Sequence, residues 1–202
     1  MNGLITNELL GNAYTYKTFR EMTDSQYAKG KISCEGDSIT LNEYAQINVQ
    51  RMMRLDKSTV INDEIKKELR SLKKKLIWLV IAEAWCGDVA HNLPVIAKIA
   101  EQSGNINLRI ILRDKNPEIM NQYLTNGGKA IPKLICFEAG TLKELGTWGP
   151  RPAPAQKLAM ELKTVPDITG EEKKRKIILW YAEDKTKTIQ NEFLNLIKSW
   201  KN

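Results

Sequence analysis

The stretch LIWLVIAEAWCGDV, residues 76–89, contains the strongest indications of the fold. Its first half, residues 76–82, is a continuous apolar run of strand length, which is typical of a strand buried on both faces. The turn-like residues 85–88, Trp-Cys-Gly-Asp, come next, and a helical pattern of apolar residues begins at Val89. The stretch therefore predicts a buried strand, a turn and a helix, with a cysteine where the helix begins.

Short apolar runs alternate with helical patterns on both sides of this stretch, from residue 73 to about residue 163. The order is strand, helix, strand, helix, strand, strand, helix. This order indicates an α/β layer with a parallel pair of strands and an antiparallel hairpin. We expect the strands over residues 76–82, 106–112, 134–137 and 142–148.

The segments that flank this central domain, residues 73–163, are more polar and are predicted to be helical. Residues 1–72 form an N-terminal extension in which one helix runs to about Leu55, and Asn62 caps the next helix. Residues 164–202 form a C-terminal extension with amphipathic spacing, which should pack on the central domain.

Composition limits the classes to which the protein can belong. The 202 residues are 42% hydrophobic, which is enough for a core, and three cysteines are too few for a disulfide scaffold. The apolar runs are too short for a membrane span, and the first residues lack the features of a secretory signal, so we expect a cytoplasmic protein. The net charge is +7, but the basic clusters at residues 73–75 and 173–176 are not interleaved with aromatic residues, so we expect no nucleic-acid partner.

Cys86 is the candidate for reactive chemistry. At the start of a helix its thiol lies near unpaired backbone N–H groups and the positive end of the helix dipole, and both favour the nucleophilic thiolate. Asp88 opposes this effect through its like charge, and the sequence does not decide which effect prevails. A small buried core cysteine is the alternative interpretation.

These features together resemble the thioredoxin family over roughly residues 73–163. Trp85-Cys86-Gly87 matches the start of the family's active-site turn, and Pro94 matches the proline that bends the active-site helix. The resemblance implies a thioredoxin-like three-layer α/β/α sandwich with a mixed sheet, to which helical N- and C-terminal extensions are added. Further matches are Asp114, Asn116, Pro117, Gly140 and the pair Ile131-Pro132, which lies at the position of the family's cis-proline.

The resemblance also implies a place where substrate docks. A cis bond before Pro132 would present the backbone of Ile131 beside the thiol, and an extended peptide or glutathione could pair with it. An ordinary trans proline at a strand edge is the alternative. If Lys133 faces Cys86, its charge would lower the pKa of the thiol and attract a carboxylate, whereas a solvated lysine at the strand edge would do neither.

Two residues depart from the family pattern. Val89 occupies the position of the second cysteine of Cys-x-x-Cys, so the turn Cys86-Gly87-Asp88-Val89 cannot close an internal disulfide. Val80 occupies the position at which many thioredoxins carry a buried aspartate. Dithiol reductase activity is therefore not expected.

The other two cysteines are poor candidates to resolve a mixed disulfide at Cys86. Cys136 lies four residues beyond Pro132 on the same predicted strand, about 13 Å away, and is interpreted as a core residue. Cys34 lies in a turn-rich region, and the sequence does not place it. We therefore expect an external thiol, from glutathione or a partner protein, as the resolver.

His91 is the single histidine and is poorly placed to act as a base. It follows Cys86 by five residues, about 140° further round a helix, so we expect it to face solvent or the rim of the site. One histidine and scattered cysteines match no zinc spacing, and no metal is expected.

Two functions remain open from the sequence. The first is thiol–disulfide exchange through Cys86 as a single nucleophile, which forms mixed disulfides with a protein or with glutathione as co-substrate. In this case Trp85 flanks the thiol, Gly87 keeps the turn close-packed, and the Ile131-Pro132 backbone docks the substrate. The second is a redox-inactive thioredoxin-fold module that binds a peptide or protein. The sequence does not reveal the oligomeric state.

Overall fold

The computed structural model describes residues 3–28 and 39–201, and Cys34 lies outside them. In the described part of the chain, four strands form one mixed sheet in the order β2-β1-β3-β4. β1 pairs in parallel with β2 and antiparallel with β3, which forms an antiparallel hairpin with β4. The strands are β1 (Leu76–Ala82), β2 (Ile106–Leu112), β3 (Lys133–Glu138) and β4 (Glu144–Trp148).

These strands and their directions confirm the sequence prediction. β1 and β2 have the predicted bounds, while β3 begins one residue earlier and β4 two residues later than expected. Differences of this size are ordinary at the ends of elements. Every residue of β1 is buried, as a continuous apolar run at the centre of a sheet requires.

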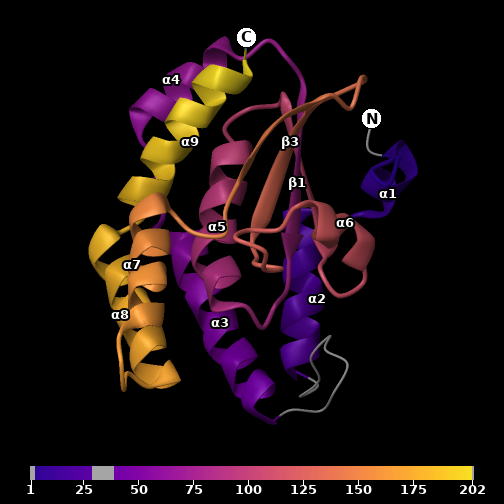
Figure 1. Ribbon diagram of the computed structural model, residues 1–202. Helices are drawn as coiled ribbons and strands as arrows, with labels where there is room; N and C mark the ends of the chain where they lie inside the picture. The colour runs from indigo at the N-terminus through magenta and orange to yellow at the C-terminus, as the bar shows by residue number, and fades with distance from the viewer. Residues whose placement is uncertain (1–2, 29–38, 202) are drawn as a thin grey trace.

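Helices on both faces of the sheet complete a three-layer sandwich. α5 (Gly87–Ala100) lies on one side of the sheet and α6 (Pro117–Gln122) on the other (Figure 1). α5 contains Pro94 and is apolar nearly all round, because α3 and α9 cover the side that faces away from the sheet. α7 (Ala153–Thr164) follows β4 and ends the predicted central domain.

The N-terminal extension is helical, as expected. Asn62 caps α4 by accepting a hydrogen bond from the Ile65 N–H at 2.8 Å, which confirms its predicted role. α3 packs along α5, and α2 packs near β2. The helices are α1 (Asn7–Asn12), α2 (Tyr16–Ala28), α3 (Ile39–Ser58) and α4 (Asp63–Ser71).

The N-terminal extension also covers an edge of the sheet. The backbone of Tyr14 exchanges two hydrogen bonds with that of Ile110 in β2, at 2.9 and 2.8 Å. β2 is otherwise an edge strand, and such edges readily pair with other chains when they are left open. The short bridge from Tyr14 therefore protects the middle of β2.

The C-terminal extension packs on the core through its last helix. α8 (Gly170–Asp184) lies along α7 and buries none of its residues, whereas α9 (Lys187–Trp200) is strongly amphipathic. The rings of Phe193 and Trp200 lie 5.2 and 5.9 Å from the ring of Trp78 in β1. The predicted amphipathic packing of this extension is therefore present, mostly in α9.

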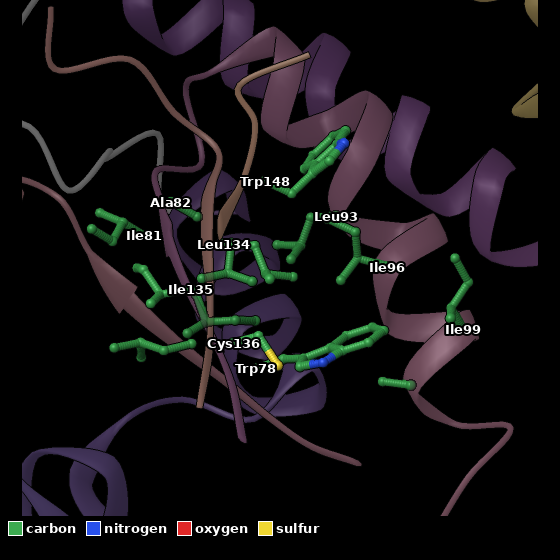
Figure 2. Packing of buried hydrophobic residues seen from close by; sticks show 14 of the residues in the cluster. Trp78, Ile81, Ala82, Leu93, Ile96, Ile99, Leu134, Ile135, Cys136 and Trp148 are labelled. Carbon is green, nitrogen blue, oxygen red and sulfur yellow. The ribbon is translucent and has the colours of Figure 1, made fainter. Parts of the chain in front are cut away.

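The centre of the core lies between the sheet and α5. Trp78 is fully buried, and Leu93, Ile96 and Ile99 of α5 lie on the same side of the sheet as its indole ring (Figure 2). Cys136 of β3 is also fully buried beside Trp78, which agrees with its interpretation as a core residue.

The N-terminal and C-terminal extensions also contact each other directly. The side chain of Gln190 in α9 donates to the carbonyl of Val60 at 3.1 Å and accepts from the N–H of Asn62 at 2.9 Å. Lys201 forms an ion pair with Glu68 of α4 at 2.5 Å. α4 and α9 lie side by side in Figure 1, so segments from both ends of the chain close the same side of the molecule.

No helix in the described ranges is long and apolar enough to span a lipid bilayer.

Candidate functional site

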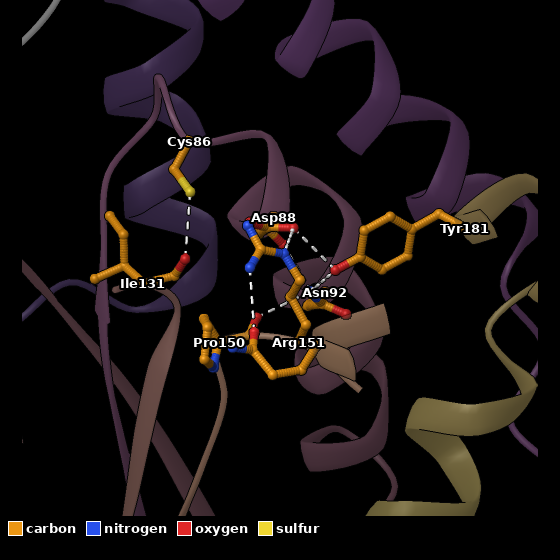
Figure 3. Close-up of polar contacts among 8 residues, drawn as sticks. Cys86, Asp88, Asn92, Ile131, Pro150, Arg151 and Tyr181 are labelled. Atoms are coloured by element: carbon orange, nitrogen blue, oxygen red, sulfur yellow. Dashed lines mark hydrogen bonds and ion pairs between the residues drawn. The ribbon is translucent and has the colours of Figure 1, made fainter. Parts of the chain in front are cut away.

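Cys86 lies where β1 leads into α5. It is the N-cap residue of α5, with an extended backbone, and it is partly exposed. Its thiol donates a hydrogen bond to the carbonyl of Ile131, with 3.3 Å between Sγ and the oxygen (Figure 3). The structure therefore brings together two segments that the sequence separates by 45 residues.

The Ile131–Pro132 peptide bond is cis, and the bond between Gly149 and Pro150 is also cis. Gly149 packs directly on the backbone of Pro132, with φ +112°, and a Cβ at this position would lie 2.2 Å from the carbonyl oxygen of Pro132. Only glycine fits such a position without a shift of the backbone. The loop after β4 is therefore in close contact with the segment beside Cys86.

Cys86 is a neutral thiol in this environment. Burial, as the largest cause, and the negative charge of Asp88 raise the pKa of Cys86 to about 12. Hydrogen bonds from the backbone N–H groups of Val89 and Asp88 at the start of α5 favour the thiolate, but their effect on the pKa is smaller. Burial, which the sequence offered only as the alternative interpretation of Cys86, therefore adds to the effect of Asp88 and outweighs that of the helix start.

Asp88 forms part of a polar cluster behind the thiol. Its carboxylate makes a two-point ion pair with Arg151, at 2.9 and 2.5 Å, and accepts from the hydroxyl of Tyr181 at 3.1 Å (Figure 3). Asn92 donates to the Tyr181 oxygen at 2.8 Å. Burial raises the pKa of Asp88, and the charge of Arg151 opposes this rise. The carboxylate that disfavours the thiolate is thus fixed by the loop after β4 and by α8.

The sequence analysis did not identify Arg151, Tyr181 or Asn92 as parts of the site. Tyr181 lies in the C-terminal extension, which was expected only to pack on the central domain, and Arg151 lies in a proline-rich loop. Both lie at least 63 residues from Asp88 along the chain, so no local pattern links them to it.

The expectation that His91 faces solvent or the rim is wrong. His91 is only 7% exposed, and its ring stacks on that of Tyr181 with 4.1 Å between centroids. Burial, with a smaller contribution from Arg51 and Arg54, lowers the pKa of His91 to about 3. The prediction from the angle between Cys86 and His91 assumed that no other element covers the helix, whereas α8 covers the face of α5 that carries His91.

The remaining predicted residues have the following places. Val89 is fully buried, so an apolar side chain fills the position of the family's second cysteine, and Val80 is fully buried in β1. The ammonium of Lys133 contacts the Thr125 hydroxyl at 3.4 Å, and burial lowers its pKa. A Cβ on Gly87 would meet nothing closer than Arg51 at 3.8 Å, so close packing does not require a glycine there, contrary to the expectation.

Trp85 flanks the turn as a partly buried side chain. The guanidinium of Arg113 lies 4.6 Å from the centroid of its ring, within the range of cation–π contacts, and also pairs with Asp114 at 2.8 Å. Glu83, a buried carboxylate that the sequence analysis missed, accepts the Asp114 N–H at 2.9 Å. These contacts connect the ends of β1 and β2 next to the turn.

The part of the chain that the structure describes holds no group of three or more histidine, cysteine, aspartate or glutamate side chains that could bind a metal ion.

Comparison with known proteins agrees with this architecture. A family model described as thioredoxin matches residues 37–164. The protein therefore belongs to the thioredoxin family. The match begins inside the N-terminal extension, well before β1, and ends with α7.

Two solved structures resemble nearly the whole chain, including both extensions. An HIV epitope-scaffold has 17% sequence identity and a TM-score of 0.61, with 95% of this chain and 96% of that chain covered. A protein of unknown function from Pseudomonas aeruginosa has 18% identity and a TM-score of 0.59, with 95% of both chains covered. At these identities the likeness concerns the fold. No curated protein matches the sequence.

Proposed function

We propose that the protein carries out thiol–disulfide exchange through Cys86, its single nucleophile, and forms mixed disulfides with a protein or with glutathione. The observation that carries this proposal is the contact of 3.3 Å between the Cys86 sulfur and the carbonyl of Ile131, at a partly exposed position. An extended substrate that pairs with the Ile131 backbone would bring its own sulfur close to that of Cys86.

The exchange reaction can be completed without a second cysteine in the turn. Cys86 loses its proton to solvent, and its thiolate attacks one sulfur of a partner disulfide. A bond forms between the Cys86 sulfur and that sulfur, the partner's S–S bond breaks, and the other half leaves as a thiolate. An external thiol, for example reduced glutathione, then attacks the mixed disulfide and is itself oxidised as Cys86 is released. A reducing compartment such as the cytoplasm would supply this thiol.

The raised pKa sets the speed of this reaction. With a pKa of about 12, Cys86 is almost entirely protonated at neutral pH, so the thiolate forms rarely and exchange is slow. The rate should increase with pH throughout the neutral and mildly alkaline range, because each rise in pH increases the thiolate fraction.

A redox-inactive module that binds a peptide or protein is the second candidate. Two observations favour it: the neutral state of the Cys86 thiol and the apolar Val89 at the position of the family's second cysteine. In this role the backbone of Ile131 still pairs with an extended segment, but the sulfur of Cys86 takes no part.

The test treats the protein with glutathione disulfide between pH 7 and pH 10 and locates the adducts by mass spectrometry. We expect a glutathione adduct at Cys86 that forms faster at higher pH and is removed by reduced glutathione. Cys136 serves as an internal control, because it has a similarly raised pKa but is fully buried. An unmodified Cys86 at pH 10 would rule out exchange and leave the binding module.

A further inference from the structure

A helix of the N-terminal extension reaches the turn that holds Cys86. Asn48 of α3 donates to the carbonyl of Ala84 at 3.1 Å, and Arg51 donates to the Asn48 side chain at 2.7 Å. The same Arg51 nitrogen would lie 3.8 Å from a Cβ on Gly87. Neighbouring Cα atoms are about 3.8 Å apart, so the Arg51 guanidinium lies within about 10 Å of the Cys86 backbone.

Arg51 is half-buried and has a second arginine beside it. Arg54 is exposed and follows on the same face of α3, three residues later. Burial, as the largest cause, and the charge of Arg54 lower the pKa of Arg51, while the charge of Asp88 opposes this. Neither guanidinium forms an ion pair with any carboxylate of residues 3–28 or 46–201, and the nearby carboxylate of Asp88 is bound by Arg151.

This arrangement has no evident purpose for folding. Placing the half-buried Arg51 cation next to another cation disfavours the folded state, because the Arg51 charge is partly desolvated and the two charges repel. Asn48, not Arg51, makes the hydrogen bond that attaches α3 to the turn, since the hydrogen bond of Arg51 returns to its own helix. Two guanidinium groups without a carboxylate are suited to hold one from a ligand, because their planar N–H donors match its geometry.

We propose that Arg51 and Arg54 form a carboxylate subsite beside Cys86, and that the partner of Cys86 is an anionic low-molecular-weight thiol or disulfide of the glutathione class. This inference rests on the thiol exchange proposed above and names its substrate. Glutathione carries a carboxylate on each side of its cysteine. In a mixed disulfide the two cysteine Cα atoms lie about 5.5 Å apart, and a terminal carboxylate lies about one residue, or about 4 Å, beyond the glutathione cysteine, so it can reach Arg51 while the sulfur is bonded to Cys86.

The experiment compares two disulfides of different charge. Glutathione disulfide is anionic and hydroxyethyl disulfide is uncharged, and the rate constant for mixed disulfide formation at Cys86 is measured for both at pH 8.5. In the variant Arg51→Gln/Arg54→Gln, we expect the ratio of the anionic to the neutral rate constant to fall about tenfold, as two partly exposed charge contacts imply. High salt should lower the same ratio in the unmodified protein by screening the two charges.

Two single variants serve as controls. Arg70→Gln makes the same change of charge at an exposed position in α4 and should leave the ratio unchanged. Arg51→Lys keeps the charge and should retain most of the preference for the anionic disulfide. Circular dichroism establishes that each variant is folded before its rates are compared. An unchanged ratio in the folded double variant would overturn the subsite.

A ligand that cannot react separates this inference from the proposed exchange. Binding of S-methylglutathione is measured by calorimetry, and we expect the double variant to lose it while Arg70→Gln retains it. If Cys86 reacts with neither disulfide but S-methylglutathione binds through the arginines, then the subsite is present and the exchange is wrong. If both disulfides react at Cys86 and S-methylglutathione does not bind, then the exchange stands and the subsite is wrong.

Discussion

At the scale of single residues, burial outweighs the position of Cys86 at a helix start. The N–H groups at the start of α5 favour a thiolate, yet the desolvated surroundings and the fixed charge of Asp88 hold the pKa of Cys86 near 12. A cysteine in a family motif is therefore not reactive by virtue of the motif alone. Its reactivity depends on groups that are distant in sequence, such as Arg151 and Tyr181, which hold Asp88 in place.

Asp88→Asn should make Cys86 more reactive. The substitution removes a negative charge that raises the pKa of the thiol and leaves the positive charge of Arg151 uncompensated, and both changes favour the thiolate. We expect alkylation by iodoacetamide at pH 8 to become several-fold faster, while the weakened hydrogen bonds to Arg151 and Tyr181 lower the free energy of unfolding by about 1–3 kcal/mol. Asp167→Asn, at an exposed position between α7 and α8, is the control and should change neither quantity.

His91 should make the protein less stable in acid. Its pKa is about 3 in the folded protein and about 6.5 in an unfolded chain, so between these values the unfolded state binds more protons. The contribution of His91 to the free energy of unfolding is therefore fully present above pH 6.5 and is lost as the pH falls below it. The loss from His91 between pH 7.5 and pH 5 should be about 2 kcal/mol by linkage.

His91→Phe tests this assignment, because phenylalanine keeps a ring against Tyr181 but does not titrate. The free energy of unfolding is measured with urea at pH 7.5 and at pH 5. Its decrease between these pH values should be about 2 kcal/mol smaller in His91→Phe than in the unmodified protein. An equal loss of stability in both proteins would show that other groups cause the acid sensitivity.

At the scale of elements, the sequence predicted the sheet well because each strand carries its own signal. The apolar run of β1 and the alternation in β2 are local patterns, and strand order follows from short connections. The candidate site could be predicted only where a motif marked it, at residues 85–89 and 131–133. Arg151, Tyr181 and Arg51 were missed because they reach the site through loop and helix packing, which leaves no mark in local sequence. For the same reason the burial of His91 could not be foreseen.

Val89→Cys tests whether the turn retains the geometry of a dithiol. Residues 86 and 89 lie one turn apart at the start of α5, where their Cα atoms are within the range that a disulfide can join. We expect an internal disulfide, seen as a loss of two hydrogens in the mass, and a gain of disulfide reductase activity.

Val95→Cys is the matched control, since Val95 is equally buried in α5 but about two turns beyond position 89. It should form no disulfide with Cys86. A disulfide in Val89→Cys without any reductase activity would mean that the cleft, rather than the missing sulfur, prevents the reaction.

At the scale of the whole molecule, both extensions belong to the folding unit. α9 covers Trp78 at the centre of the core, and Gln190 links α9 to the segment between α3 and α4. The predicted division of the chain reflects its composition, with segments at residues 1–72, 73–163 and 164–202. The packing of α3, α4 and α9 against one core indicates that they unfold together.

Gln190→Ala should lower the stability of the entire protein. It removes the partners of the Val60 carbonyl and the Asn62 N–H, at a position that is only 6% exposed. We expect a loss of about 1–3 kcal/mol in the free energy of unfolding. Urea transitions followed by tryptophan fluorescence and by circular dichroism should still coincide.

Gln102→Ala is the control, because Gln102 is exposed and bonds only to its own helix end. It should change stability by less than about 0.5 kcal/mol. Two separate transitions in Gln190→Ala would show instead that the extensions fold independently of the sandwich.

The backbone bridge between Tyr14 and Ile110 has a consequence for how the chain can be shortened. A protein trimmed to the start of the family match at residue 37 would keep the four strands of the described sheet but lose this bridge. The outer rim of β2 would then offer free amide and carbonyl groups to any second molecule, and oligomers joined strand to strand would become accessible. The boundary at which sequence similarity begins is thus not the boundary at which the fold can safely be cut.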